Sequence, residues 1–378
     1  MNLKSEQPTI EPYKLPNGWK WVRLGEVCEV IMGQSPPGYT YTEMPSGLPF
    51  FQGKADFGDY YPRPRIWCTQ PIKIAVKGDI LISVRAPVGP VNMNNLECCI
   101  GRGLAAIRCK DDAINWFIFW YLRSIEDQIV SLGSGSTFGA ITRNDLISIQ
   151  VPLPPLEDQR RIIAKIQELM QEVERARTAC EKQLEAVKAL PSAYLREVFE
   201  SEEAKKWERK KLGEVCVFEY GSGLPQRDRL GGSVPVFGSN GIVGYHNVAI
   251  TKGPTIIIGR KGSIGQVNYS EIPCWPIDTT YYIDSSKTNS DLIWLYWLLK
   301  SLRLDLLNRA TGVPGLNRED AYNQIVPLPP LPEQKRIATY LKEKMAYVER
   351  LKVSIEKQLE AINALPQAIL RKAFRGEL

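Results

Sequence analysis

The sequence predicts an α+β (mixed α/β) protein in which two similar globular domains alternate with two long coiled-coil helices. The first observation is an internal repeat: the segment VPLPPLEDQRRI at residue 151 returns as VPLPPLPEQKRI at residue 326. Residues 151–199 and 326–374 are identical at 27 of 49 positions, which identifies a duplication. The second observation is a heptad pattern of apolar residues in both copies, and the third is a set of short apolar runs outside them.

The composition limits the class of protein. The chain has 378 residues, 44% of them apolar and 24% charged, which is typical of a globular protein and excludes a disordered or fibrous one. The longest apolar runs, 116–122 and 292–299, are too short to span a bilayer, and the N-terminal segment lacks the apolar block of a secretory signal. Eight cysteines without a regular framework are typical of a reducing compartment. We therefore expect a cytoplasmic protein.

The order of the repeats predicts four segments. A weaker repeat, LGEVC, begins at Leu24 and again at Leu212, so the parts outside the strong repeat also share a frame. We place a first globular domain at residues 1–152 and a first helix with a hinge at 153–206. A second globular domain follows at 207–327, and a second helix with a C-terminal tail at 328–378.

Each globular segment has the pattern of a small α/β domain. Short apolar runs at 80–84 and 255–258 indicate buried strands. Each domain also has one aromatic segment with helical spacing, at 113–131 and 291–309. Their tryptophans are expected in the core, since an aromatic stripe on a helix is more often core than a surface for stacking bases.

The repeated segments predict long helices that begin after a proline-rich stretch. Apolar residues recur at steps of four and three, as in a coiled-coil seam, although an ordinary amphipathic helix in a globular core is the alternative. Gln183 and Gln358 occupy the same seam position and, if the helices pair antiparallel, are expected to help fix the register. Pro191 and Pro366 are expected to end or kink the helices, with a short amphipathic helix after each. The predicted seam consists of Ile162, Ile166, Leu169, Val173 and Leu190 in the first copy, and Ile337, Leu341, Val348, Leu351, Ile355, Ile362 and Leu365 in the second.

No motif for catalysis or metal binding is found in the sequence. His246 is the single histidine and no C-x-x-C pair exists, so we expect no metal site. A catalytic triad would have to use His246, for which a structural or surface role in a loop is the better interpretation. The sequence has no G-x-x-x-x-G-K-[ST] phosphate loop, no glycine-rich AdoMet loop and no Asn-Pro-Pro-aromatic motif. We therefore expect a chain that is not an enzyme.

Loops that contain glycine and arginine are the remaining feature of the sequence that indicates a function. Arg85 and Arg260 follow strands at equivalent places in the repeat, and Arg143 and Arg318 follow loops rich in Ser, Thr and Gly. Glycine allows a backbone to approach a phosphate, and arginine binds phosphates or guanine edges. The alternative for each arginine is a solvated turn or a structural ion pair. The net charge of +6 is modest, so DNA binding would depend on local patches or on partners.

The sequence resembles the DNA specificity subunits of type I restriction-modification systems. The resemblance rests on the two LPPL-x-[ED]-Q-[KR]-R-I segments, the two EKQLEA segments and the LRKAF at residue 370, and it covers essentially the whole chain. It implies that each globular segment is a target recognition domain for one half of a bipartite DNA site. It also implies that the two helices pack antiparallel and set the spacer between the half-sites.

The resemblance further implies the partners and cofactors. Two modification subunits, which are adenine-N6 methyltransferases, would bring AdoMet, and restriction subunits that use ATP and Mg²⁺ would join them on double-stranded DNA. This chain would bind no cofactor itself. The candidate DNA-binding residues, chosen by loop position, are Gln34, Ser35, Lys54, Arg85, Arg102, Thr137, Arg143 and Asn144 in the first domain, and Arg227, Ser239, Asn240, Arg260, Lys261, Thr311, Asn317 and Arg318 in the second.

Two alternatives remain open from the sequence. A specificity subunit can serve a methylase alone or a fused restriction–methylation enzyme. A general coiled-coil adaptor without DNA function is the other alternative, but it predicts featureless polar loops instead of paired glycine and arginine loops.

Overall fold

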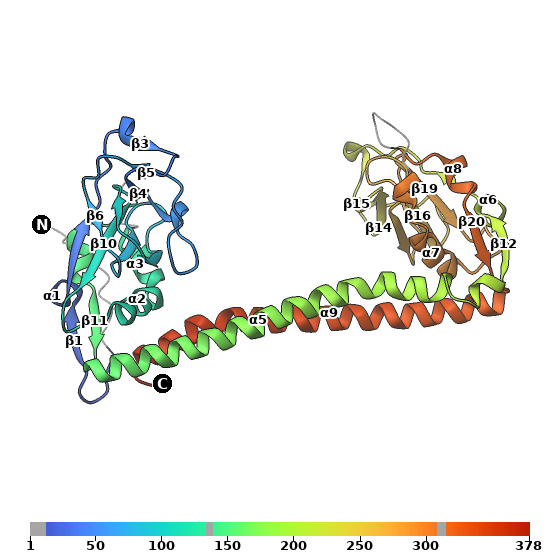
Figure 1. Ribbon diagram of the computed structural model, residues 1–378. Helices are drawn as coiled ribbons and strands as arrows, with labels where there is room; N and C mark the ends of the chain where they lie inside the picture. Colours follow the sequence, from blue (N-terminus) through green and yellow to red (C-terminus); the bar gives the residue numbers. More distant parts are fainter. Residues whose placement is uncertain (1–12, 134–138, 308–314) are drawn as a thin grey trace, which may run out of the picture. The chain divides into compact units, whose positions relative to one another are not determined.

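A computed structural model describes residues 13–133, 139–307 and 315–378 (Figure 1). The chain forms two compact units: Met1–Ala179 with Leu359–Leu378, and Cys180–Gln358. Each unit therefore combines one globular domain with segments of both long helices. The four segment boundaries given above stay a prediction, since the two units divide the chain within the helices. No helix in the described part of the chain is long and apolar enough to cross a membrane.

The first domain is built on two sheets and a two-stranded ribbon. A four-stranded sheet has the order β2-β10-β7-β8, and a five-stranded sheet has the order β3-β5-β4-β9-β6. The ribbon pairs β1 with β11 in antiparallel register, which joins the two ends of the domain. The strands are β1 Lys20–Arg23, β2 Cys28–Met32, β3 Tyr41–Thr42, β4 Leu48–Phe51, β5 Trp67–Cys68, β6 Ile74–Ala75, β7 Ile80–Ser83, β8 Val91–Met93, β9 Cys98–Ile100, β10 Leu104–Cys109 and β11 Gln150–Leu153.

The helices of the first domain are short. They are α1 Leu24–Val27, α2 Asn115–Ser124, α3 Glu126–Gly133 and α4 Arg143–Ser148, with 3₁₀ turns η1 Gly38–Thr40 and η2 Lys54–Asp56. The aromatic segment predicted as one helix over 113–131 is thus two helices, α2 and α3. Phe117 and Trp120 of α2 are buried in the core, as expected, whereas Trp116 is half-buried.

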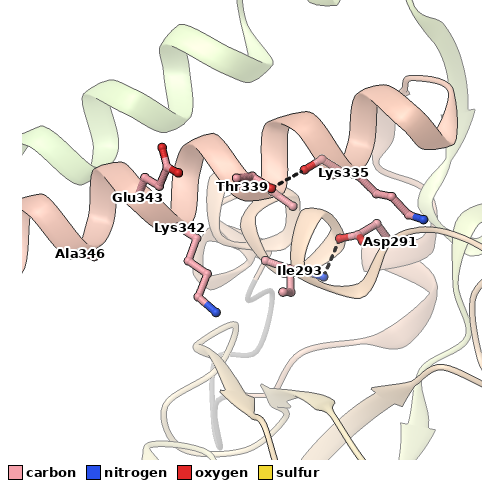
Figure 2. A pocket seen from close by; sticks show the side chains of 8 residues that line it. Asp291, Ile293, Lys335, Thr339, Lys342, Glu343 and Ala346 are labelled. Atoms are coloured by element: carbon pink, nitrogen blue, oxygen red, sulfur yellow. Dashed lines mark hydrogen bonds between the residues drawn. The ribbon is translucent and has the colours of Figure 1, made fainter.

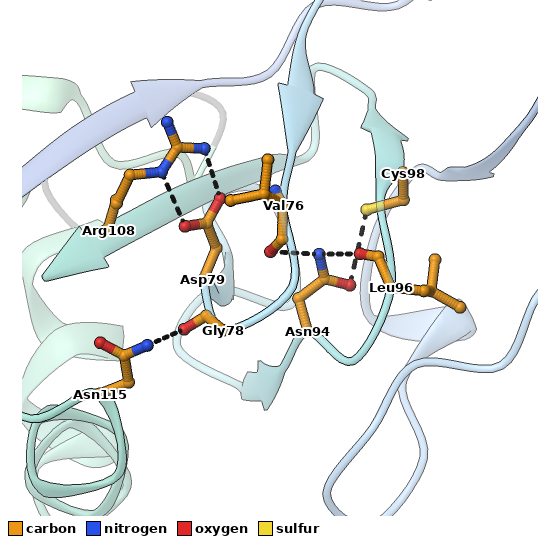
Figure 3. A network of polar contacts seen from close by, with 8 residues as sticks. All are labelled: Val76, Gly78, Asp79, Asn94, Leu96, Cys98, Arg108 and Asn115. Carbon is orange, nitrogen blue, oxygen red and sulfur yellow. Dashed lines mark hydrogen bonds and ion pairs between the residues drawn. The ribbon is translucent and has the colours of Figure 1, made fainter.

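A polar network around the buried carboxylate of Asp79 ties the start of β7 to β10 (Figure 3). Asp79 accepts two hydrogen bonds from Arg108, at 2.9 and 2.8 Å, and a third from the Val76 N–H at 2.8 Å. The hydrogen bonds that Arg108 donates to Asp79 raise the pKa of Arg108 above its usual value. The side chain of Asn94 donates to the carbonyls of Val76 and Leu96, at 2.8 and 2.6 Å. A buried carboxylate is stable here because all its partners are supplied by the fold.

The second domain repeats the four-stranded sheet and the ribbon of the first, whereas its remaining sheet is smaller. Its four-stranded sheet has the order β13-β19-β16-β17, its ribbon pairs β12 with β20, and a three-stranded sheet has the order β15-β14-β18. The strands are β12 Glu208–Lys211, β13 Glu219–Tyr220, β14 Val234–Gly238, β15 Gly241–His246, β16 Thr255–Gly259, β17 Val267–Ser270, β18 Trp275–Pro276, β19 Thr280–Asp284 and β20 Ile325–Leu328. The mixed α/β class and the internal repeat predicted from the sequence are confirmed.

The second domain also has short helices. They are α6 Leu212–Val215, α7 Leu292–Ser301 and α8 Arg318–Tyr322, with 3₁₀ turns η3 Ala204–Lys206, η4 Gln226–Asp228 and η5 Leu304–Leu307. The aromatic helix expected over 291–309 is therefore α7 followed by a 3₁₀ turn. Trp294 is fully buried, as expected, and Trp297 is half-buried.

The two long helices are α5 Leu156–Phe199 and α9 Leu331–Phe374, each of 44 residues (Figure 1). Pro191 and Pro366 do not end the helices, because both lie inside a continuous helix; the other expected effect, a kink, stays a prediction. An interior proline costs about 3 kcal/mol. Packing offsets this cost, because the helical segment after each proline carries a buried phenylalanine. Phe199 lies in the core of the second unit, and Phe374 lies in the core of the first.

The helices pair antiparallel where their contacts are recorded. In the second unit the Cys180 thiol lies 3.5 Å from the Ile355 carbonyl, and the Tyr340 hydroxyl donates to Glu197 at 3.1 Å. Of the predicted seam, Ile162, Ile166, Ile337, Leu341, Val348 and Ile355 are buried, and Leu169, Val173, Leu190, Leu351 and Ile362 are half-buried.

Three seam predictions are wrong. Leu365 is 43% exposed. Leu190, at the same position of the first copy, is half-buried instead, so the exposure of Leu365 depends on what covers this part of α9. Gln183 and Gln358 are exposed as well and need no buried partner, so they do not fix the register as expected.

The buried glutamines are instead Gln159 and Gln334, at the start of each long helix. Gln159 accepts a hydrogen bond from the Ile114 N–H at 2.9 Å and donates to the carbonyls of Asp112 and Pro154, both at 3.0 Å. Gln334 accepts from the Asp291 N–H at 2.8 Å and donates to the Pro329 carbonyl at 2.9 Å. Each glutamine therefore fastens a long helix to the start of the aromatic helix of its domain.

Candidate nucleic-acid interface

The candidate loops of the first domain are tied to one another through the backbone. The Gln34 N–H donates to the Ile100 carbonyl at 3.0 Å, and the Ser35 hydroxyl accepts from the Arg102 N–H at 3.2 Å. A side chain at Gly103 would place its Cβ 2.2 Å from the Gln52 carbonyl oxygen, so the loop of Arg102 also touches the one before Lys54. The structure thus brings Gln34, Ser35, Arg102 and the Lys54 turn together.

Two further loops meet the same surface. The Val84 N–H donates to the Gly103 carbonyl at 2.9 Å, and the Ile141 N–H donates to the Val84 carbonyl at 3.0 Å. Arg85 and Arg143, predicted from the repeat, therefore lie on adjoining loops. Arg85 is exposed, and Arg143 donates from Nε to the Val30 carbonyl at 3.2 Å. Asn144 is exposed beside Arg143 in α4, whereas Thr137 lies outside the described residues.

In the second domain the candidate loops converge on the Thr279 carbonyl. It accepts hydrogen bonds from the N–H groups of Arg260 and Lys261, at 2.9 and 3.1 Å, and from the Ser239 hydroxyl at 2.7 Å. The Leu316 N–H donates to the Arg260 carbonyl at 2.9 Å, which adds the loop before α8. This surface is the counterpart of the one in the first domain.

The individual side chains on this surface differ in whether they are exposed and free to contact DNA or are used within the fold. Ser239 is 8% exposed and its hydroxyl is used within the fold, so its role is structural. Asn240 and Lys261 are exposed. Asn317 caps α8 by accepting from the Glu319 N–H at 2.8 Å. Thr311 lies outside the described residues.

Arg227 stands apart from this group. It lies on η4 with a side chain 86% exposed, and its only recorded polar neighbour in the described part of the chain is Asp228, at 3.8 Å. No hydrogen bond between described residues joins it to the Thr279 loops.

Two of the predicted arginines converge on one tyrosine that the sequence analysis missed. The guanidinium carbons of Arg260 and Arg318 each lie 5.4 Å from the centre of the Tyr220 ring. Tyr220 is 47% exposed and packs edge-on against Tyr281 at 5.1 Å between ring centres. Burial raises the pKa of Tyr281 to about 12, although both arginines act to lower it. Only the position of Tyr220 directly before Gly221 in the sequence could have drawn attention to it.

The described residues offer no obvious alternative chemistry. Among them, no group of three or more His, Cys, Asp or Glu side chains could hold a metal ion. All eight cysteines are free, and burial raises the pKa of Cys98 and Cys216 to about 12. His246 is 7% exposed, accepts a hydrogen bond from the Leu230 N–H at 3.2 Å and packs edge-on against Trp275. These contacts indicate a structural histidine.

Comparison with known proteins identifies the family. A family model described as "Type I restriction modification DNA specificity domain" matches residues 16–185 and 204–361, which is most of the chain and both halves of the repeat. The chain belongs to this family. The resemblance inferred from the LPPL and EKQLEA segments is therefore confirmed.

Relatives in the family differ in how much of their length is matched. The putative type I restriction enzyme MjaX specificity subunit of Methanocaldococcus jannaschii is 47% identical over 156 residues, which cover 40% of this chain and 37% of that subunit. The EcoDI specificity subunit of Escherichia coli is 25% identical over 414 aligned positions, which cover 97% and 90% of the two chains.

Two solved structures share the fold over nearly the whole chain. The HsdS subunit of Thermoanaerobacter tengcongensis has a TM-score of 0.69 at 27% identity, covering 97% of this chain and 99% of that one. A chain from a study of complex assembly and conformational transition in the type I R-M system has a TM-score of 0.77, also at 27% identity, with coverage of 97% and 100%.

Proposed function

We propose that this chain is the non-catalytic DNA specificity subunit of a type I restriction-modification complex. Each globular domain reads one half of a bipartite site in double-stranded DNA. The observation that carries this proposal is the recurrence of the same converging loops in both domains, with Arg143 and Arg318 at equivalent places. The predicted equivalence of Arg85 and Arg260 is wrong, because the same backbone hydrogen bonds place Arg260 at the position of Val84 and Arg85 at that of Lys261. Loops that present arginine beside glycine suit contacts with phosphates and base edges.

The long helices set the distance between the half-sites in this proposal. Half-sites read from one face of DNA lie ~34–36 Å apart, or a multiple of that distance. Both α5 and α9 have 44 residues and belong in part to each compact unit, as a spacer requires. A length of 44 residues also far exceeds that of an ordinary globular helix.

Two modification subunits are the proposed protein partners. Each unit has a cavity beside its aromatic helix, of about 880 Å³ in the first unit and about 560 Å³ in the second. Figure 2 shows the second, which is lined by Lys335, Lys342 and Glu343 of α9 and by Ile293 of α7, with Lys342 extending on the side of α9 that faces Ile293. The first cavity is lined by Trp116 and Gln167. The repeat places Gln167 at the position of Lys342, and Trp116 corresponds to Ile293 because each lies two residues after the residue whose N–H donates to the buried glutamine. Equivalent cavities in both units favour two copies of one partner.

The cofactors belong to the partners in this proposal. The modification subunits bring AdoMet for adenine-N6 methylation, and restriction subunits, where present, use ATP and Mg²⁺. The complex works in the cytoplasm. The alternative is a specificity subunit of a methylase-only or fused restriction–methylation system, in which this chain has the same role.

Exchange of one domain tests the proposal. Residues 207–327 are replaced by the corresponding domain of another specificity subunit, and the adenine-methylation motif of the complex is determined. We expect one half-site to change while the other half-site and the spacer length stay the same. A motif that changes in both halves, or in neither, contradicts the proposal.

A further inference from the structure

We infer that Arg318 is the side chain of the second domain that reads a guanine in its half-site, and that Arg260 and Tyr220 hold it in position. This inference rests on the proposed function. It assigns separate roles to two arginines that the repeat alone makes equal candidates.

Arg318 is held in place, but its hydrogen-bond donors are not used by any residue that the structure describes. Its guanidinium carbon lies 5.4 Å from the centre of the Tyr220 ring and 5.8 Å from that of Tyr322. It makes no hydrogen bond or ion pair with any other residue that the structure describes. A guanidinium carries five N–H donors in its own plane, so contacts with ring faces leave these donors available.

The aromatic platform below Arg318 is fixed by hydrogen bonds. The Tyr322 hydroxyl accepts from the Phe218 N–H at 2.7 Å, and the Tyr281 hydroxyl donates to the Leu316 carbonyl at 3.2 Å. Tyr220 packs against Tyr281 and lies opposite it in the pairing of β13 with β19. Arg318 therefore loses less side-chain freedom on binding DNA than a solvated arginine would.

Arg260 is a positioning residue because two of its five N–H donors are already used within the fold. Its Nε and Nη2 both donate to the Asp278 carbonyl, at 3.2 and 2.7 Å, while its guanidinium lies over Tyr220 and Tyr281. This geometry orients the guanidinium toward the fold and the tyrosine ring. Arg260 thus affects base recognition indirectly, by holding the Tyr220 ring in position under Arg318.

Guanine is the base that suits the free guanidinium. Two N–H groups of arginine match the O6 and N7 acceptors of guanine in the major groove, which is the commonest specific contact of arginine. Among the described residues of the first domain, no tyrosine takes the place of Tyr220, because Met32 stands where the second domain has Tyr220. Arg143 of the first domain also uses Nε on the Val30 carbonyl. The inference therefore concerns the second half-site only.

The test compares variants of the full chain in complex with its modification subunits. Binding is measured at fixed salt to DNA in which each base of the second half-site is permuted. We expect R318A and R318K each to weaken binding of the cognate site about tenfold to a hundredfold and to accept any base at one guanine position. Y220F, which keeps the ring, should bind as the wild type does, whereas Y220A and R260A should relax the same guanine position.

The control is R209A, which removes an exposed arginine of the same domain outside the loop surface. It should leave the permutation profile unchanged, and every variant should keep its recognition of the first half-site. Rescue by R318K, or equal weakening on all sequences, would identify a phosphate contact and overturn the inference. An unchanged profile in R318A would overturn it as well. A wild-type complex without any bipartite preference would instead refute the proposed function itself.

Discussion

The side chain of Gln159 accepts a hydrogen bond from the backbone N–H of Ile114, 2.9 Å away and just before α2. In the second half, Gln334 accepts from Asp291, just before α7, at 2.8 Å. Gln159 is fully buried and Gln334 is 4% exposed. Both halves of the duplicated chain therefore keep the same hydrogen bond between the start of a long helix and the domain it packs against.

Removing this fastening should destabilise the unit that contains it. In Gln159→Ala, the Ile114 N–H and the carbonyls of Asp112 and Pro154 lose the partner that the buried glutamine supplies. We expect the free energy of unfolding to fall by about 1–3 kcal/mol, as measured by urea denaturation. Gln183→Ala is the matched control, since Gln183 is exposed on the same helix, and it should change stability by less than about 0.5 kcal/mol. Equal effects of the two variants would contradict this role of Gln159.

The Asp79–Arg108 pair gives a second prediction about stability. The Asp79 side chain is 3% exposed and bonded to both Arg108 and Val76, so Asp79→Ala should cost about 3 kcal/mol in urea denaturation. The exposed Lys165–Glu168 pair has a similar distance, 3.0 Å, and Glu168→Gln should cost less than about 0.5 kcal/mol. A small cost for Asp79→Ala would show that the network of Figure 3 contributes little to stability.

Glu126 should make stability depend on pH. It is half-buried at the edge of the larger cavity, and burial raises the pKa of its carboxyl in the folded chain. An acid whose pKa is raised by folding contributes stability at low pH and loses that contribution as pH rises through the folded-state pKa. Glu126→Gln should therefore raise the melting temperature at pH 7 by about 1–2 °C, since solvent screening limits the effect, and not at pH 4. A lower melting temperature at pH 7 would show that the ionised carboxylate is stabilising.

Lengthening both helices tests the spacer role. In the second unit the contact of Cys180 with Ile355 places Ala186 opposite the stretch near Glu349, so seven residues are inserted after each. Seven residues add ~10 Å to a helix, which corresponds to about three base pairs. Sequencing of methylated DNA should show both half-sites unchanged and a longer spacer. Full methylation of the original motif by this variant would contradict the spacer role.

The doubled fold could be predicted because the duplication is visible in the sequence. The pairs Gln159 with Gln334 and Phe199 with Phe374 recur in register, and their helices and burial recur in the structure. Pro191 and Pro366 were misleading, since a local rule about proline does not include the packing of the residues that follow. The exposure of Gln183 likewise depends on what covers the helix, which the heptad pattern alone does not contain.

The candidate interface could be predicted as a set of loops but not as a set of contacts. The repeat identified Arg260 and Arg318, but it could not show that both lie over Tyr220. That arrangement depends on the pairing of β13 with β19 and on the hydrogen bond from Arg260 to the Asp278 carbonyl. Ser239 shows the converse, because a residue in a promising loop is buried and bonded to Thr279.

The most direct measurement is a genomic map of N6-methyladenine in the source strain, with and without the gene for this chain. The account predicts that deletion removes methylation from one bipartite motif and leaves all other motifs unchanged. Re-expression of the chain should restore that motif. An identical map with and without the gene, in cells that express the modification subunit, would contradict the assignment of this chain as the DNA specificity subunit.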